Sequence, residues 1–300
     1  MHRGVMVAVV GYGLWGLSPI FWRLGDGSAG DILVVRILAT VTLLVVVQVV
    51  RDRAAQVRER LADPRVRRMM IVSSMLLAGN WLGFIWAVTN DRVLEASLGY
   101  FLNPLVSVVL GVTVLGERLR RGQWCAVGLA GAGVAILSIE LGSLPWISLY
   151  LAGSFGLYGL VRKTAPVESL DGLTIEVATM APLAAIALGA LTADGTGLST
   201  VSTPTGWVWA AGASLMTAVP LLMFGWAARR IELWLVGVLQ YITPTLQFLL
   251  GVLAYGESWS GGQAAGYVVI WVGLLLFAAE GVVAARRSRV GGPERPVSRR

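Results

Sequence analysis

Long apolar runs separated by short polar segments make up most of this chain. A helix needs about 20 mostly apolar residues to cross a bilayer, and ten runs approach or exceed that length. The runs cover residues 4–24, 30–50, 69–90, 94–115, 123–142, 146–162, 172–191, 206–228, 233–255 and 263–284. No segment between them is long enough for a globular domain. The pattern therefore predicts an all-α integral membrane protein with ten transmembrane helices.

The second half of the chain repeats the first at a constant shift of 140 residues. The segment Leu94–Glu117 returns as Trp234–Glu257, with a proline and a terminal Gly-Glu at matching places. A fixed period of this kind indicates internal duplication. We expect one five-helix copy in residues 1–142, a second in 143–285, and a basic, disordered cytoplasmic tail in 286–300.

Each copy holds five predicted helices, an odd number, so the second copy enters the bilayer from the opposite side. Inverted repeats are typical of secondary transporters, which place their binding site near the midplane between the copies. The predicted fold class is thus two inverted five-helix repeats.

Composition and charge placement agree with a membrane protein. Charged residues make up 14% of the chain, whereas soluble domains have roughly a quarter. The basic clusters lie in alternate connections, at Arg51–Arg68, Arg118–Arg121, Arg162–Lys163 and Arg229–Arg230, and in the tail. Positive charge marks the cytoplasmic side, so we expect both termini there. The net charge of +7 then requires no nucleic-acid partner.

Polar side chains recur on one face of the fourth and ninth predicted helices. They are Tyr100, Asn103 and Ser107 in the first copy, and Gln240, Thr243 and Gln247 in the second. Pro104 and Pro244 each lack an N–H and free a carbonyl on the same stripe. We interpret the stripes as substrate contacts and the prolines as hinges. In the alternative interpretation, the stripes bond to neighbouring helices and the prolines only kink the chain.

Aromatic and polar residues gather at matching places in other helices. The candidates for substrate binding are Trp15, Ser18, Asn80, Trp81, Trp86, Tyr158 and Trp226. A cavity lined by such residues would suit amphipathic or aromatic metabolites, or cations held over ring faces. The alternative is ordinary packing and interfacial belts, where Trp and Tyr are common.

Two charges lie inside predicted helices, Arg36 and Glu176, and the repeat relates them. Ionisable groups in a bilayer must be paired, neutralised or near water. Our hypothesis is that Glu176 titrates during transport, or pairs with Arg36 in one state, with a proton or another ion as the coupling partner. The alternatives are a structural pair and two side chains that reach the interface.

Several classes of chemistry are excluded by residue counts. The chain has one histidine, His2, and one cysteine, Cys125, so we expect no metal site, no cofactor, no catalytic residues and no enzyme activity. Glu117 and Glu257 follow helix ends beside a glycine, and we expect both to be solvated.

Seven short segments together resemble the RarD subgroup of the EamA family, in the drug/metabolite transporter superfamily. They are Asn80-Trp81, Phe84–Ala87, Leu94–Phe101, Asn103–Leu105, Leu115–Arg118, Gly159–Lys163 and Gln240–Ile242. The resemblance implies a multi-pass carrier of the bacterial inner membrane with a central cavity. Family members often carry a histidine before the arginine of the second helix, whereas this chain has Val35 before Arg36. A histidine-dependent proton role there is not expected.

The repeat and the resemblance together predict a secondary-active transporter in the lipid bilayer, as a monomer or homodimer. We expect it to export small amphipathic metabolites, amino acids or drugs by alternating access. The alternatives are a lipid flippase and a membrane scaffold that transports nothing.

Overall fold

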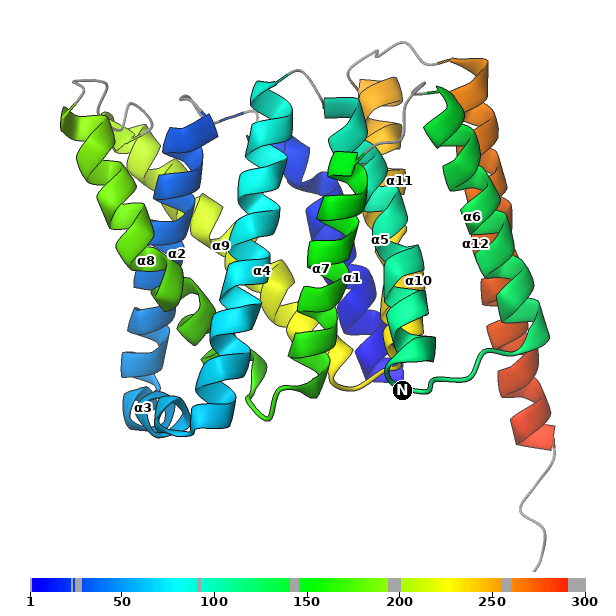
Figure 1. Cartoon of the computed structure of the whole chain (residues 1–300), viewed down its shortest axis with the longest axis horizontal. Helices are drawn as coiled ribbons and strands as arrows, with labels where there is room; N and C mark the ends of the chain where they lie inside the picture. Colours follow the sequence, from blue (N-terminus) through cyan, green and yellow to red (C-terminus); the bar gives the residue numbers. More distant parts are fainter. Residues whose placement is uncertain are drawn as a thin grey trace, which may run out of the picture. The chain divides into compact units, whose positions relative to one another are not determined.

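A computed structural model describes residues 2–22, 24, 29–90, 93–140, 146–193, 201–254 and 260–290 (Figure 1). Within these ranges the regular structure is helical throughout, and no strand occurs. The elements are α1 (His2–Trp22), α2 (Ala29–Val50), α3 (Ala54–Ala62), α4 (Pro64–Thr89), α5 (Val93–Thr113), α6 (Arg121–Glu140), α7 (Trp146–Thr164), α8 (Ser169–Ala193), α9 (Pro204–Ala228), α10 (Leu233–Gln240), α11 (Ile242–Leu249), the π-helix η2 (Leu250–Ala254) and α12 (Gly261–Val290).

Each predicted apolar run lies mainly on helical structure among the described residues, and the chain is an all-α membrane protein. In the described residues, six helical segments are long and apolar enough to cross a membrane. They lie in α1, α2, α6, α8, α9 and the stretch from α10 through η2. Shorter apolar helices occur at Leu98–Thr113 in α5 and Gly261–Phe277 in α12. The number of ten spans stays a prediction.

Local sequence signals account for several helix ends. Asp63 is the N-cap of α4, where its side chain accepts a hydrogen bond from the Arg65 N–H and Pro64 occupies the first turn. Thr203 caps α9 in the same way, accepting from the Gly206 N–H at 3.2 Å. Short polar acceptors at the N-cap and proline in the first turn both favour helix initiation.

The two proline helices differ. α5 continues through Pro104 without interruption, but the helix that we expected over 233–255 is divided at Tyr241 into α10 and α11 and then becomes the π-helix η2. Pro244 cannot donate to the carbonyl of Gln240, which favours a break just before it. Residue 255 lies outside the described part.

The chain forms two compact units. The first contains Met1–Glu117 and Leu144–Ser258, and the second contains Arg118–Ser143 and Trp259–Arg300. In the first unit α1 packs on α9, α10 and α11, α7 on α4 and α5, and α2 on α8 and α9 (Figure 1). The second unit is the pair α6 and α12. This grouping sets the fifth helix of one predicted copy against the fifth helix of the other.

Apolar side chains fill the centre of the first unit and also cover its outside. Its main core joins α1, α4, α7, α8 and α9 through residues such as Tyr12, Leu77 and Leu173. Many large apolar residues are exposed instead, among them Ile186 at 70% and Val208 at 74%. Extended exposed apolar surface marks an interaction site, and here lipid is the natural neighbour.

In the second unit the helices approach closely through small residues. A Cβ atom placed on Gly133 of α6 would lie 2.6 Å from the Gly266 carbonyl oxygen of α12. Close backbone approach at glycines is common between membrane helices. α12 continues past residue 286, where we expected the tail to begin, and ends at Val290; residues 291–300 lie outside the described part.

Candidate functional site

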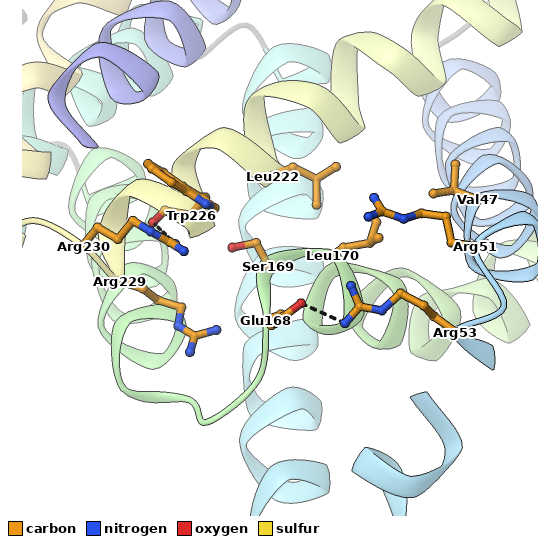
Figure 2. Close-up of a pocket in the computed structure, with 10 residues that line it drawn as sticks. All are labelled: Val47, Arg51, Arg53, Glu168, Ser169, Leu170, Leu222, Trp226, Arg229 and Arg230. Atoms are coloured by element: carbon orange, nitrogen blue, oxygen red, sulfur yellow. Dashed lines mark hydrogen bonds and ion pairs between the residues drawn. The ribbon is translucent and has the colours of Figure 1, made fainter. Parts of the chain in front are cut away.

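A pocket of ≈ 750 Å³ lies in the first unit where α2 ends, α8 begins and α9 nears its end (Figure 2). It is lined by Val47, Arg51, Arg53, Glu168, Ser169, Leu170, Leu222, Trp226, Arg229 and Arg230. The lining combines an apolar wall with four guanidinium groups and one carboxylate. Its volume lies within the range of small-molecule sites.

Two chain segments supply the arginines, from opposite sides of the pocket (Figure 2). Arg51 and Arg53 follow the end of α2, where Asp52 turns the chain with a φ of 52°. Asp tolerates this left-handed region better than most residues. Arg229 and Arg230 follow α9, and the Arg230 guanidinium lies 3.8 Å from the centre of the Trp226 ring. Partial burial lowers the pKa of Arg229, and the nearby positive charges of Arg162 and Arg230 lower it further.

A salt-bridge network ties the α2 end of the pocket to α8. Arg53 Nη2 contacts Glu168 Oε2 at 2.8 Å and Asp171 Oδ2 at 3.3 Å, while Gln48 Nε2 donates to Asp171 Oδ1 at 3.0 Å. The hydrogen bond and charge of Arg53 lower the pKa of Glu168. This contact therefore stabilises the fold at neutral pH and is lost as pH falls through the lowered pKa.

A second network adjoins the pocket through Ser169 and is fully buried. Arg162 of α7 and Glu176 of α8 are 1% and 0% exposed, with Nη1 and Oε1 3.4 Å apart. Ser73 Oγ donates to Glu176 Oε1 at 2.5 Å and Tyr158 OH to Oε2 at 3.4 Å. Arg162 Nη2 also donates to the Ser169 carbonyl at 3.1 Å, which connects the ion pair to the pocket lining.

Two glycines leave room for the buried guanidinium. A Cβ on Gly225 of α9 would lie 2.6 Å from Arg162 Nη2, and a Cβ on Gly172 of α8 would collide with Nη1. The sequence placed Arg162 in a basic cluster of a connection between helices, whereas the structure buries it in the last turn of α7. The signal that could have found it is Glu176, an intramembrane carboxylate that requires a counter-charge.

Arg36 does not pair with Glu176 here. Its Nε donates to Thr217 Oγ1 of α9 at 2.8 Å. Its guanidinium carbon lies 4.2 Å from the ring centre of Trp81 on α4 and 5.3 Å from that of Trp22 on α1. Contacts from three helices direct this cation toward the inside of the unit.

Only some of the polar side chains in the two stripes form hydrogen bonds with neighbouring helices. Thr243 donates to the Tyr12 carbonyl at 2.9 Å and Gln247 to the Trp15 carbonyl at 3.4 Å, as in the alternative interpretation. Asn103 Oδ1 and Gln240 Oε1 are buried and have no hydrogen-bond partner among the described residues.

The other stripe residues also lie in packed surroundings. Ser107 is buried where α5 meets α10. A Cβ atom placed on Gly237 of α10 would lie 2.8 Å from Ser107 Cβ. The ring of Tyr100 contacts that of Phe84 at 5.9 Å between centres.

The aromatic candidates are divided among several places. Trp15 and Tyr158 pack with Phe155 and Phe224 in one ring cluster, with centres 5.3–6.2 Å apart. Their surroundings are those of a packed core. Of the predicted binding residues, all of which are described, Trp226 alone lines the pocket.

The remaining candidates make local contacts. Ser18 donates to the Trp15 carbonyl at 2.8 Å, and Asn80 donates to Ser154 Oγ at 2.9 Å. The ring of Trp86 contacts that of Trp146 at 5.2 Å.

Glu117 caps a helix, so the expectation that it is solvated is wrong. Its carboxylate accepts the N–H groups of Leu233 and Trp234 at 2.7 and 3.0 Å, at the start of α10. Lys163 lies 3.4 Å away and also donates to the Ile231 carbonyl at 2.6 Å. Helix N-termini attract carboxylates because their first N–H groups are unpaired. Glu257, the repeat partner, lies outside the described residues.

Replacing Glu117 with alanine is expected to lower the free energy of unfolding by about 1 kcal/mol or more, because α10 loses its cap and Lys163 its counter-charge. Glu232→Ala is the matched control: Glu232 is the N-cap residue of the same helix, but its side chain makes no capping bond. Unfolding in detergent measures both variants. Equal losses would contradict the capping role.

Comparison with known proteins agrees with the helical fold. A model of the EamA-like transporter family matches residues 2–139. The chain is 41% identical to Protein RarD of Escherichia coli (strain K12), over 96% of this chain and 97% of that protein. It is 40% identical to an uncharacterized transporter of Vibrio cholerae serotype O1, over 96% of both chains. The chain therefore belongs to the EamA-like transporter family and to its RarD subgroup, and it is a membrane transporter.

Two further similarities are more distant. The Chloramphenicol-sensitive protein RarD of Pseudomonas aeruginosa is 33% identical over 72% of this chain and 71% of its own. A crystal structure of a protein with 20% identity shares the fold with a TM-score of 0.67, covering 91% of this chain and 96% of the other. The conserved fold at such low identity supports the helical architecture.

Proposed function

We propose that this chain is a secondary-active exporter of small amphipathic metabolites, amino acids or drugs, working by alternating access. One observation carries the proposal: a small-molecule-sized pocket opens at one end of the first unit, and a hydrogen bond from Arg162 to the Ser169 carbonyl links its lining to a buried ion pair. The basic residues at its mouth match the cytoplasmic side by the positive-inside pattern. An exporter loads from that side.

The packing of the first unit supports the inverted-repeat model. In the predicted repeat, α1 corresponds to α7, α2 to α8 and α4 to α9. The contact between α1 and α9 should then have a counterpart between α7 and α4, and the contact between α2 and α9 one between α8 and α4. All four contacts occur. Contacts that match under exchange are what any two-fold axis between related copies produces, and the odd number of predicted helices in each copy places that axis in the membrane plane. In such transporters, one copy moves against the other around a site between them.

The buried ion pair gives the proposal a coupling group. A proton arriving at Glu176 would weaken its attraction for Arg162, and Arg162 holds the Ser169 carbonyl at the pocket. A change of protonation would thus reach the pocket lining through one side chain. Glu176→Gln should therefore remove the pH dependence of transport, and an unchanged pH dependence would eliminate this coupling role.

Counterflow into proteoliposomes tests the carrier itself, with a panel of amino acids, aromatic metabolites and chloramphenicol. Leu222→Trp places a large ring in the pocket, and we expect it to abolish accumulation of the compound that the wild type transports. Leu253→Trp is the control, because Leu253 is 79% exposed and does not line the pocket. No accumulation of any compound by folded wild type would favour a flippase or a scaffold.

A further inference from the structure

Among the described residues of the first unit, no carboxylate forms an ion pair with the Arg36 guanidinium. The ion pairs of the described residues join Arg53 with Glu168 and Asp171, Arg162 with Glu176, and Lys163 with Glu117. Arg36 takes part in none of them. Burying an unpaired charge in a membrane is costly, and such residues usually face the protein interior and mark a pathway or a site.

The contacts that Arg36 does make leave most of its donors unused. Arginine carries five N–H donors, and only Nε is used, toward Thr217. Among the described residues neither Nη atom has an acceptor within hydrogen-bond distance. The ring faces of Trp22 and Trp81 stabilise the cation but accept no conventional hydrogen bond. Arg36, Trp22 and Trp81 are all half-buried, so each keeps some open surface.

We propose that Arg36 binds the carboxylate of the transported molecule, whose apolar body lies against Trp22 and Trp81. The two Nη groups form a planar fork that matches a carboxylate, and Thr217 holds the fork in place through Nε. This inference rests on the proposed function and narrows its substrate class to organic anions.

The charge of the pocket is an independent observation that favours the same class. Arg51, Arg229 and Arg230 line it, and Arg51 has no side-chain partner among the described residues. Glu168, the single carboxylate of the lining, is already engaged by Arg53. A concave site lined by one sign of charge raises the local concentration of ions of the other sign.

Calorimetric titration of the full chain in detergent tests the proposal with two probes of equal shape, 3-phenylpropionate and 3-phenylpropionamide. We expect the acid to bind at least about tenfold more tightly than the amide, because a charge-assisted bond contributes more than a neutral one. Arg36→Gln should remove this preference, while Arg36→Lys should keep part of it. Arg58→Gln, at an exposed arginine of α3, is the matched control and should keep all of it.

Equal binding of acid and amide by the wild type, binding of neither, or an unchanged preference in Arg36→Gln would each overturn the inference. Thermal unfolding of Arg36→Gln shows whether a loss of binding comes from a loss of folding. If Arg36→Gln does not fold, Arg36→Lys, which preserves the cation, takes its place in the test. Acid-selective binding that depends on Arg36 without any transport would refute only the proposed function. Transport that does not distinguish acid from amide would refute only the carboxylate site.

Discussion

Replacing Glu176 with alanine is expected to destabilise the folded protein by about 3–5 kcal/mol, because Arg162 stays buried without its counter-charge. The guanidinium is 1% exposed and is enclosed at Gly172 and Gly225, so it cannot turn to water. Ser73 and Tyr158 would also lose their shared acceptor. Denaturant unfolding in detergent measures the change.

Two further variants separate the ion pair from its surroundings. The double variant Arg162→Met with Glu176→Leu removes both charges and should recover most of the lost stability, since apolar replacements of buried pairs are often neutral or stabilising. Glu168→Ala breaks a pair whose carboxylate is 64% exposed and should cost about 1 kcal/mol at most. A loss in Glu176→Ala no larger than in Glu168→Ala would refute the buried pair.

Replacing Gly133 with alanine is expected to destabilise the α6 and α12 pair by about 1–3 kcal/mol, because the added methyl group has no room. It would lie 2.6 Å from the Gly266 carbonyl oxygen and 2.6 Å from Ile270 Cγ1. A backbone atom cannot move aside as a flexible side chain can, so the helices must separate and lose contact along their length.

Gly131→Ala is the matched control on the same helix. A Cβ at Gly131 meets nothing within 4 Å, and alanine favours helix over glycine by about 1 kcal/mol. This variant should therefore be as stable as the wild type or slightly more stable. Both are measured by unfolding in detergent, and equal behaviour of the two variants would contradict close packing at Gly133.

The helices were predictable because each run long enough to cross a bilayer is a strong local signal. α3 was missed for the converse reason: its sequence AAQVRERLA is short and charged, so it resembles a polar connection. Pro104 and Pro244 were both interpreted as hinges or kinks, but only the helix with Pro244 is divided, at Tyr241, whereas α5 is unbroken at Pro104. Surrounding packing decides between these outcomes, and the local sequence does not contain it.

The candidate site was only partly predictable because symmetry and contact are different relations. Arg36 and Glu176 occupy equivalent positions in the predicted repeat, but equivalent residues of two copies touch only where they approach the axis that would relate the copies. Phe101 and Tyr241 are such a pair, with ring centres 6.4 Å apart. Glu176 instead found a partner in Arg162, which the sequence places beside Lys163 at a helix end, where basic residues normally reach water.

Lys163 is the single lysine of the chain, and its ammonium group is held by the Glu117 carboxylate and the carbonyls of Ala228 and Ile231. Protein grown with lysine enriched in ¹⁵N at Nζ would therefore give a single ammonium-nitrogen resonance in a nuclear magnetic resonance spectrum. That resonance needs no assignment, and it reports on the junction of α7, α9 and α10. Ligand titrations could follow this junction directly, without introducing a foreign probe.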